Sequence, residues 1–445
     1  MLKKLCYQKM SILFAAIVTW ATIGFCQVGD DCPDFGPFFC FNRLTGAPDS
    51  EIGAGIGRKV VVDGDIALVG VTSSPLAHFL DTTTDGDDLV LASVSGEGGD
   101  GFGYSVSIKG DFAAVGAPNG DYIRVIEIDR SSPGDLIVSQ TNFSDPTEQF
   151  YDINNLNGFG HDVGVSSTFV VAGEPNETPG DDEGSIQLLA AGAAHVFNTQ
   201  TGMLNATLEN PEPKKGDAFG SYVAIEETAA SNFNWAYVAI SAHQDDNGNG
   251  ADSGRVYLYF VSDIDGLAPV LLETFPRASD VAEIKSTIPS TIKRLSGIKF
   301  GQDTEIKNGQ LLVTYTGGAI MYDLTTNGFP TKSFDNPIET AASNSQTGSF
   351  DGDHVVIGTP RPQIDLEGSY DGGFVYVYDA DSTVIQQIIV DPTQNGPFDG
   401  DPGAAEEWPN SIAVDNGVLL TGSPLDNEFG FYTGEVNIFN TESDD

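Results

Sequence analysis

The sequence predicts an all-β fold, a seven-bladed β-propeller made of four-stranded antiparallel blades, and three observations support this prediction. A unit that in most copies opens on a Phe-Gly pair, as in "GDGFGYSVSIKGDFAAVGAP" at residues 99–118, occurs seven times along the chain. Each copy holds short runs of alternating apolar and polar residues, the pattern of half-buried strands. Gly, Asp and Asn turns separate the runs. Small repeated sheets bury their apolar faces against one another, and a ring of them is a propeller.

The first two strands of each unit have a nearly constant length. Sixteen residues separate the opening aromatic residue from a proline in three copies, which are Phe102–Pro118, Phe159–Pro175 and Trp408–Pro424. A fourth copy keeps this interval without the aromatic residue, between Asn344 and Pro360. The remaining copies open at Ile56-Gly57, Phe219-Gly220 and Phe300-Gly301, and the Phe219 copy has a longer turn. The recurring interval predicts one hairpin per unit.

The second half of each unit supplies two further strands. A polar loop leads to a third alternating run, such as "AHVFNT" or "FVYVYDA", and most copies add a fourth, such as "MLNATLENP". Residues 52–445 are 394 residues, or about 56 per copy, which suits a four-stranded blade. A helical pattern competes with strands only at residues 279–295, where we expect a helical turn on the rim.

The last copy ends after its third strand, in "EVNIFNTESDD". The N-terminal stretch "FFCFNRLTGAPD" is similar to "AHVFNTQTGMLN" of the third copy. We therefore expect residues 37–50 to pair with the last blade and close the ring, so that no edge strand is left open; a free N-terminal tail is the alternative. Residues 27–51 form this closing segment. Cys32 and Cys40, eight residues apart, are expected to form a disulfide that pins it.

Residues 1–26 have the pattern of a secretory signal peptide. Lys3, Lys4 and Lys9 precede an uncharged apolar stretch at residues 11–25, and cleavage is expected near Cys26. A retained membrane anchor is the alternative, although fifteen residues is short for a bilayer span. The prediction is a secreted, extracellular protein with one propeller domain at 52–445 and no membrane span after the signal is removed. A monomer is expected.

The charge balance is strongly acidic. The chain has 64 Asp and Glu against 20 Lys and Arg, a formal net charge of −44. Binding of nucleic acid or of an anionic membrane through bulk electrostatics is therefore not expected, because both need clustered basic residues. The composition suits divalent cations, basic partners or a salty medium. Simple solubility of an exported protein is the alternative explanation.

At its Phe-Gly and Gly-Ala-Pro positions the chain resembles the FG-GAP repeat family, which includes the blades of integrin α-chain propellers and many exported microbial proteins. The best matches are "FGYSVSIKGDFAAVGAP", "FGHDVGVSSTFVVAGEP" and "FGSYVAIE…AYVAISAHQDDNGNGADSGRVYLYF". The resemblance covers nearly all of the mature chain. It implies an extracellular scaffold for binding proteins or glycans, a role in adhesion, and Ca²⁺ in some blade loops. Propellers serve many unrelated functions, so the resemblance specifies fold more than function.

The calcium candidate is "DDNGNGADSG" at residues 245–254. Asp245, Asn247, Asn249 and Asp252 could offer oxygen ligands around a glycine turn, as Ca²⁺ loops do. Two departures from the integrin-type loop count against it. Ser253 stands where that loop has an acid, and the stretch follows the Gly-Ala-Pro segment instead of preceding it. A plain hairpin connection is the alternative.

Four loops between second and third strands are expected on one face of the ring, at residues 176–192, 243–253, 361–373 and 425–433. Their acids, with Tyr370 and Phe431, could bind a basic protein or a glycan; merely solvated loops are the alternative. The first hypothesis is thus a non-catalytic binding or adhesion propeller. An extracellular polysaccharide lyase or hydrolase is the second, and a structural surface protein the third. An enzyme should place Tyr, His, Arg or paired acids at the mouth of the central channel.

The five histidines are interpreted as structural, and the sequence shows no catalytic triad. His78 and His195 share one repeat position, while His161, His243 and His354 occur singly. The Phe-Gly pairs are interpreted as architecture: the ring fills the space between blades and the glycine allows the turn. Three sequons would be glycosylated in a eukaryotic source, at Asn142, Asn176 and Asn205.

Overall fold

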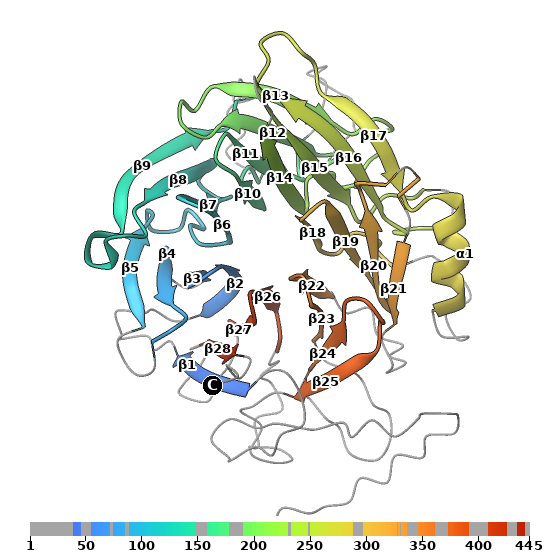
Figure 1. Ribbon diagram of the computed structural model, residues 1–445. Coiled ribbons are helices and arrows are strands. Elements are labelled where there is room, and N and C mark those ends of the chain that lie inside the picture. Colours follow the sequence, from blue (N-terminus) through green and yellow to red (C-terminus); the bar gives the residue numbers. More distant parts are fainter. Residues whose placement is uncertain are drawn as a thin grey trace, which may run out of the picture.

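The structure is a computed structural model in which part of the chain is described. The described residues are 39–45, 55–71, 74–84, 89–146, 158–177, 190–229, 233–247, 250–287, 297–326, 328–329, 331–335, 346–360, 373–390, 408–424 and 434–440. Within them, 28 strands form seven four-stranded antiparallel sheets arranged in a ring (Figure 1). The predicted all-β propeller with four-stranded blades is confirmed.

The blades follow one another in chain order. Blade 1 holds β2 (Ile56–Asp63), β3 (Ile66–Val71), β4 (Leu76–Asp81) and β5 (Val90–Ser95). Blade 2 holds β6 (Ser105–Lys109), β7 (Phe112–Ala117), β8 (Tyr122–Ile128) and β9 (Ile137–Ser144), with a 3₁₀ turn at Pro133–Asp135. Blade 3 holds β10 (Val163–Val165), β11 (Phe169–Glu174), β12 (Ala193–Asn198) and β13 (Leu204–Glu209).

The other blades repeat the pattern. Blade 4 holds β14 (Val223–Ala229), β15 (Asn234–Ala242), β16 (Arg255–Ser262) and β17 (Val270–Phe275). Blade 5 holds β18 (Thr304–Lys307), β19 (Gln310–Tyr315), β20 (Gly318–Asp323) and β21 (Thr331–Asp335). Blade 6 holds β22 (Thr347–Phe350), β23 (His354–Thr359), β24 (Phe374–Asp379) and β25 (Ile385–Val390). Blade 7 holds β26 (Ser411–Asp415), β27 (Val418–Ser423), β28 (Glu435–Asn440) and β1 (Phe39–Thr45).

The first strand of each blade lies nearest the ring axis and the fourth lies at the rim (Figure 1). The hydrophobic core is divided among the spaces between neighbouring blades. One cluster, for example, joins Leu68 and Phe79 of blade 1 to Val106 and Val115 of blade 2. Burying one such side chain stabilises the fold by about 1.5–3 kcal/mol, so each blade depends on both of its neighbours.

The Phe-Gly pairs have the architectural role that the sequence predicts. Phe102, Phe159 and Phe219 are at most 1% exposed. Gly103 has a φ of +89°, and a Cβ there would lie 2.3 Å from the backbone oxygen of Leu76 in the preceding blade. Only glycine fits this close contact, so the pair sets both the packing between blades and the turn into the first strand.

Strand β1 pairs antiparallel with β28, with Phe39 opposite Asn440 and Leu44 opposite Val436. It is the outermost strand of blade 7, within the residues that the sequence suggests for that place. The predicted signal peptide, residues 1–26, lies outside the described residues. Cys32 lies outside them too, so its disulfide with Cys40 stays a prediction.

A single helix, α1 (Ala278–Thr287), is described outside the blades and lies on the rim (Figure 1). It overlaps the stretch for which the sequence predicts a helical turn. Ile284 packs into the core between blades 4 and 5. No helix in the described part of the chain is both long and apolar enough to cross a membrane.

Candidate functional site

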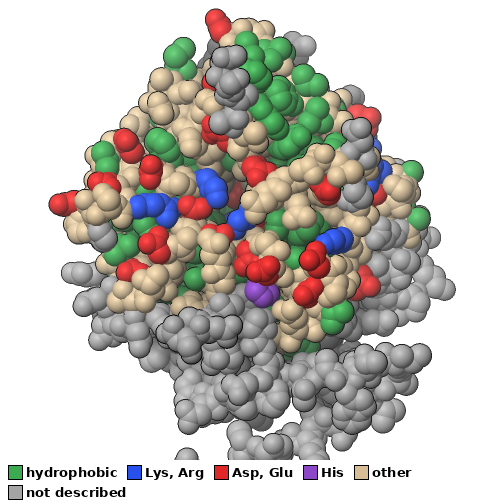
Figure 2. Space-filling view, in the orientation of Figure 1, with side chains coloured by type: hydrophobic (Ala, Val, Ile, Leu, Met, Phe, Trp, Pro, Cys, Tyr) green, Lys and Arg blue, Asp and Glu red, His purple; other side chains and the backbone are tan. Residues whose placement is uncertain are grey.

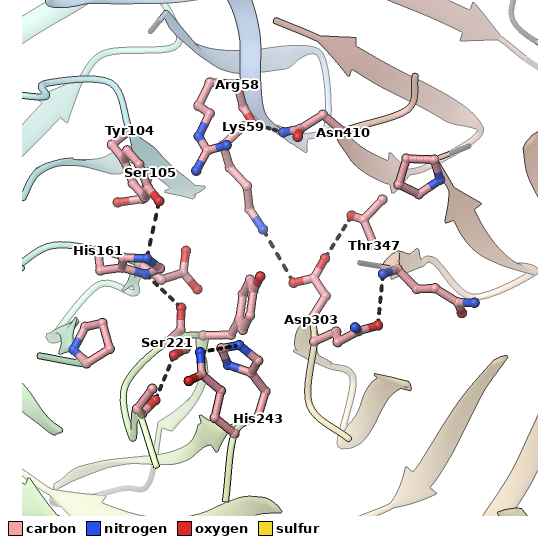
Figure 3. Close-up of a pocket in the computed structure, with 18 of the residues that line it drawn as sticks. Arg58, Lys59, Tyr104, Ser105, His161, Ser221, His243, Asp303, Thr347 and Asn410 are labelled. Atoms are coloured by element: carbon pink, nitrogen blue, oxygen red, sulfur yellow. Dashed lines mark hydrogen bonds and ion pairs between the residues drawn. The ribbon is translucent and has the colours of Figure 1, made fainter. Parts of the chain in front are cut away.

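A polar cavity of about 540 Å³ lies on the ring axis (Figure 3). Most of its wall comes from the residues that directly follow the Phe-Gly or equivalent pair of each blade. These wall residues are Arg58, Lys59, Tyr104, Ser105, His161, Asp162, Ser221, Tyr222, Gln302, Asp303, Gln346, Thr347 and Asn410. The one or two residues at this place in each repeat thus differ from blade to blade, and all seven blades contribute them to one site.

The local backbone explains this convergence. Each glycine of the pair turns the chain with a positive φ, for example +94° at Gly57 and +84° at Gly160. The next residues then start the innermost strand, whose side chains alternate between the two sides of the blade. Because blades 1 to 5 enter the axis with the same glycine turn, these positions of the five blades meet there.

Two basic residues stand on one side of the cavity. The Arg58 guanidinium lies 4.2 Å from the centre of the Tyr104 ring, a cation–π contact. Lys59 extends to Asp303, with 3.4 Å between Nζ and Oδ1. Burial alone would lower the pKa of Lys59, but Asp303 and Asp162 outweigh it and hold the pKa above its ordinary value. Lys59 therefore carries a positive charge, and the nearby Asp303 and Asp162 balance that charge within the cavity.

Arg58 is different from Lys59. No carboxylate in the described part of the chain forms an ion pair with its guanidinium. The face in Figure 2 carries scattered acidic side chains and few basic ones. Because no described carboxylate pairs with it, the Arg58 guanidinium is free to donate hydrogen bonds to a carboxylate or sulfate group of a ligand.

The tautomer of His161 follows from its contacts. Nδ1 lies 3.0 Å from the Ser221 carbonyl oxygen, which only accepts, so Nδ1 carries the proton. Nε2, 3.3 Å from the Tyr104 hydroxyl, then accepts from Tyr104. Burial, with smaller effects of Arg58 and Lys59, lowers the pKa of His161 to about 4. At neutral pH the ring is uncharged.

Asp162 is the buried acid beside His161. One carboxylate oxygen accepts from the backbone N–H of Val223 at 2.8 Å. Burial raises the pKa of Asp162 to about 6, and Lys59 lowers it only in part. Asp303, by contrast, accepts from the Thr347 hydroxyl at 2.9 Å and from Lys59. The two acids therefore differ in environment although they occupy the same repeat position.

Three polar atoms on the cavity wall are buried without a hydrogen-bond partner among the described residues. They are Nδ1 of His243, Nε2 of Gln302 and Oε1 of Gln346. His243 packs edge-on against Tyr222, with ring centres 5.7 Å apart, and burial lowers its pKa to about 4. A buried polar group without a hydrogen-bond partner destabilises the fold by about 1–3 kcal/mol unless water or a ligand bonds to it.

The structure describes three of the four predicted calcium ligands. The Asp245 side chain is fully buried and paired, with the Arg255 Nε at 3.4 Å and the Tyr257 hydroxyl at 3.1 Å. Asn247 Oδ1 accepts from the Ser253 hydroxyl at 2.6 Å. Asp252 is exposed, and Asn249 lies outside the described residues. Arg255 thus pairs with one oxygen of the Asp245 carboxylate, and calcium binding at this stretch stays a prediction.

The other predicted positions fall at the surface or outside the described part. The three sequon asparagines, Asn142, Asn176 and Asn205, are exposed. Of the four predicted binding loops, most of 176–192 and nearly all of 361–373 and 425–433 lie outside the described residues. The described ends do place Asn176, His243, Gln244 and Pro360 on the wall of the cavity.

The cavity residues were not among the predicted site residues, because the Phe-Gly pairs were interpreted as architecture. The signal was present: Phe-Gly recurs, while the next residue changes from Arg58 to Tyr104, His161, Ser221 and Gln302. His161 and His243 belong to this wall, not to structural positions alone. The cluster of Tyr, His, Arg and paired acids is also the one that the sequence analysis named as the mark of an enzyme.

The ring and its axial site define the class of protein: a seven-bladed β-propeller with a polar central cavity. Residues 90–125, from β5 to β8, match the model of the FG-GAP repeat. Together with the seven blades, this match supports an FG-GAP repeat propeller. No curated protein matches the sequence.

Solved structures with similar folds are remote in sequence. Apo AztD from Citrobacter koseri is 13% identical, with a TM-score of 0.42 over 87% of this chain and 90% of that one. Hydrazine synthase of Kuenenia stuttgartiensis is 10% identical, with a TM-score of 0.48 over 89% and 98%. Raptor from Chaetomium thermophilum is 10% identical, with a TM-score of 0.49 over 92% of this chain and 29% of that chain.

Proposed function

We propose that this protein is a secreted binding or adhesion propeller that recognises an acidic glycan at its central cavity. A cavity of about 540 Å³ suits one or two sugar units and not a flat protein surface. Tyr104 and Tyr222 line this cavity together with amide and hydroxyl side chains, which can hydrogen-bond to sugar hydroxyls. Arg58 would bind a carboxylate or sulfate group of the sugar.

The observation that carries this proposal is the set of orphaned polar atoms on His243, Gln302 and Gln346. They come from blades 4, 5 and 6, while Arg58 comes from blade 1. Buried polar groups are normally satisfied by protein, water or a ligand. A polyhydroxylated ligand offers the donors and acceptors that they lack.

The test is binding to a panel of glycans that contains uronic acid, sulfated and neutral members. Acidic glycans should bind, and Arg58→Gln should weaken that binding by about 10-fold or more, the value of a charged hydrogen bond. Lys109→Gln is the matched control, since Lys109 is exposed and pairs with Asp63 on β2. Equal binding of neutral glycans, or unchanged binding by Arg58→Gln, would contradict the proposal.

Recognition of a basic protein by the acidic loops at 176–192, 243–253, 361–373 and 425–433 is a further part of the proposed binding role. So is assistance by Ca²⁺ at Asp245 and its neighbours. Calorimetric melting with and without a chelator tests the calcium part: an unchanged melting temperature in the Asp245→Ala protein and the wild type alike would end it.

A second candidate function, a polysaccharide lyase, is favoured by the contact of Tyr104 with His161 beside Arg58. In a lyase, Arg58 would neutralise a uronate carboxylate and make the neighbouring C–H more acidic. The His161–Tyr104 pair would take that proton and return one to the glycosidic oxygen that leaves, as a carbon–carbon double bond forms. Ultraviolet absorbance of that double bond in digested polyuronates tests this candidate.

A further inference from the structure

A second polar cluster lies between blades 2 and 3, outside the cavity-lining set. It consists of Asp145, directly after β9, Glu174, at the end of β11, and His195, in β12. Each offers one ligand atom, and these atoms all lie within 4.8 Å of one another. All three residues are buried, and Glu174 and His195 have no exposed surface.

Glu174 shows that the cluster is incomplete. Its Oε2 lies 2.7 Å from Nε2 of His195. Its Oε1 is buried and has no hydrogen-bond partner among the described residues. The carboxyls of Asp145 and Glu177 lie close to the Glu174 side chain. A fully buried carboxylate oxygen that faces other carboxylates is a strongly unfavourable arrangement without a positive charge.

The charges around Glu174 point the same way. No lysine or arginine in the described part of the chain forms an ion pair with Glu174, whose contact with a basic side chain is with His195 alone.

The next junction of the ring, between blades 3 and 4, is an internal comparison. Strand register makes Ala193 equivalent to Arg255, since Glu174 pairs with Ala193 as Ala242 pairs with Arg255. At that junction Asp217 and Asp245 are buried carboxylates, and the Arg255 Nε lies 3.4 Å from Asp245 Oδ2. The chain supplies its own cation there. Between blades 2 and 3 the same position is an alanine.

We propose that Asp145, Glu174 and His195 bind one divalent transition-metal ion, Zn²⁺ or Mn²⁺, between blades 2 and 3, with Glu177 beside it. One imidazole with carboxylates suits these metals better than Ca²⁺ or Mg²⁺, which prefer oxygen ligands alone. Nδ1 of His195 lies 3.1 Å from the Thr207 hydroxyl. That partner would hold the ring so that Nε2 faces the metal, as outer-shell groups do in metal sites.

The position gives the ion a structural consequence. It would join the rim strand of blade 2 to the second and third strands of blade 3. Pro175 and Asn176, which follow Glu174 directly, line the central cavity. The metal would therefore fix one part of the cavity wall, and this holds whether or not the proposed glycan is the ligand.

The test starts with the full chain, stripped with a chelator and titrated with each metal alone. We expect one equivalent of Zn²⁺ or Mn²⁺ per chain by calorimetry and elemental analysis, with weaker binding of Ca²⁺ and Mg²⁺. Glu174→Gln should lower the metal affinity by about 100-fold or more, because even outer-shell changes cost 10–100-fold. Circular dichroism checks that the variant folds.

The matched control is His78→Gln. His78 occupies the same repeat position as His195, but blade 1 has Val71 where blade 3 has Glu174. The His78→Gln variant should therefore bind the metal with the same affinity as the wild type. Sub-stoichiometric metal, equal affinity in Glu174→Gln, or affinity lost instead in Asp245→Asn would overturn the proposal.

Crystals of the wild type grown with Zn²⁺ or Mn²⁺ keep the test decisive if Glu174→Gln does not fold. Anomalous scattering should then show a peak between Asp145, Glu174 and His195. A peak elsewhere, or none, would overturn the assignment of the site.

Discussion

Lys59 of blade 1 and Asp303 of blade 5 meet across the axis of the ring, with 3.4 Å between Nζ and Oδ1 (Figure 3). The two blades are not neighbours, and 244 residues separate the partners in sequence. The ion pair is mostly buried, with side-chain exposures of 23% and 8%. It therefore links opposite walls of the cavity that no strand pairing connects.

Lys59→Met should destabilise the protein, because it leaves Asp303 buried without its cation. A fully buried pair costs about 3–5 kcal/mol to break, and partial exposure of Lys59 reduces the expected loss to about 2 kcal/mol. Denaturant unfolding measures it. The double variant Lys59→Met with Asp303→Asn should recover part of the loss; a double variant no more stable than Lys59→Met would speak against a paired charge.

Asp162 should make stability fall as pH rises. Its folded pKa, about 6, is above the ordinary 3.8, so the folded protein binds this proton more tightly than the unfolded chain does. The stabilisation is full below pH 3.8 and is lost as pH rises through 6, to a total of about 3 kcal/mol. The free energy of unfolding of wild type minus Asp162→Asn should therefore decrease between pH 4 and pH 7. A flat difference would show that Asp162 is not buried in this way.

His161 should make the stability of the protein rise as pH rises, the opposite of the effect of Asp162. Its folded pKa, about 4, is below the ordinary 6.5, so its contribution is present above pH 6.5 and is lost as pH falls toward 4. The difference between wild type and His161→Gln should increase from pH 4 to pH 7, by up to about 3 kcal/mol. Thermal unfolding at several pH values, or the imidazole signal in NMR titration, measures it. A titration midpoint near 6.5 would contradict the buried, neutral ring.

Strand β1 is expected to hold the ring closed. A chain that lacks residues 1–45 would leave β28 as an open edge, which favours association with other copies. Such a chain should melt at a lower temperature and self-associate in size-exclusion chromatography. The control is a chain that lacks residues 1–38 and keeps β1. Equal melting temperatures for the two chains would show that the pairing does not close the propeller.

Much of the fold could be predicted from sequence because it is built from local, repeated signals. The interval from Phe102 to Pro118 specifies a hairpin, and its recurrence specifies a ring of blades. The strand after Phe38 was located from its likeness to a third-copy strand, and β1 lies there. Each of these inferences needs only residues that are close in the chain or equivalent between copies.

The sites could not be predicted in the same way. Arg58, His161 and Asp303 line one cavity because their blades converge on one axis. The sequence of a single copy does not indicate how close these residues come to one another. Glu174 and His195 looked like ordinary strand residues until strand register placed them together with Asp145. The pairing of Arg255 with Asp245, beside the predicted calcium stretch at 245–254, is likewise visible only in the folded chain.

The most direct measurement of the central claim is a crystal structure of the protein with an acidic oligosaccharide. The account predicts ligand density inside the axial cavity, with its anionic group on the Arg58 guanidinium and its hydroxyls on Gln302, Gln346 and His243. Density only on the outer loops, with the cavity holding water alone, would contradict it.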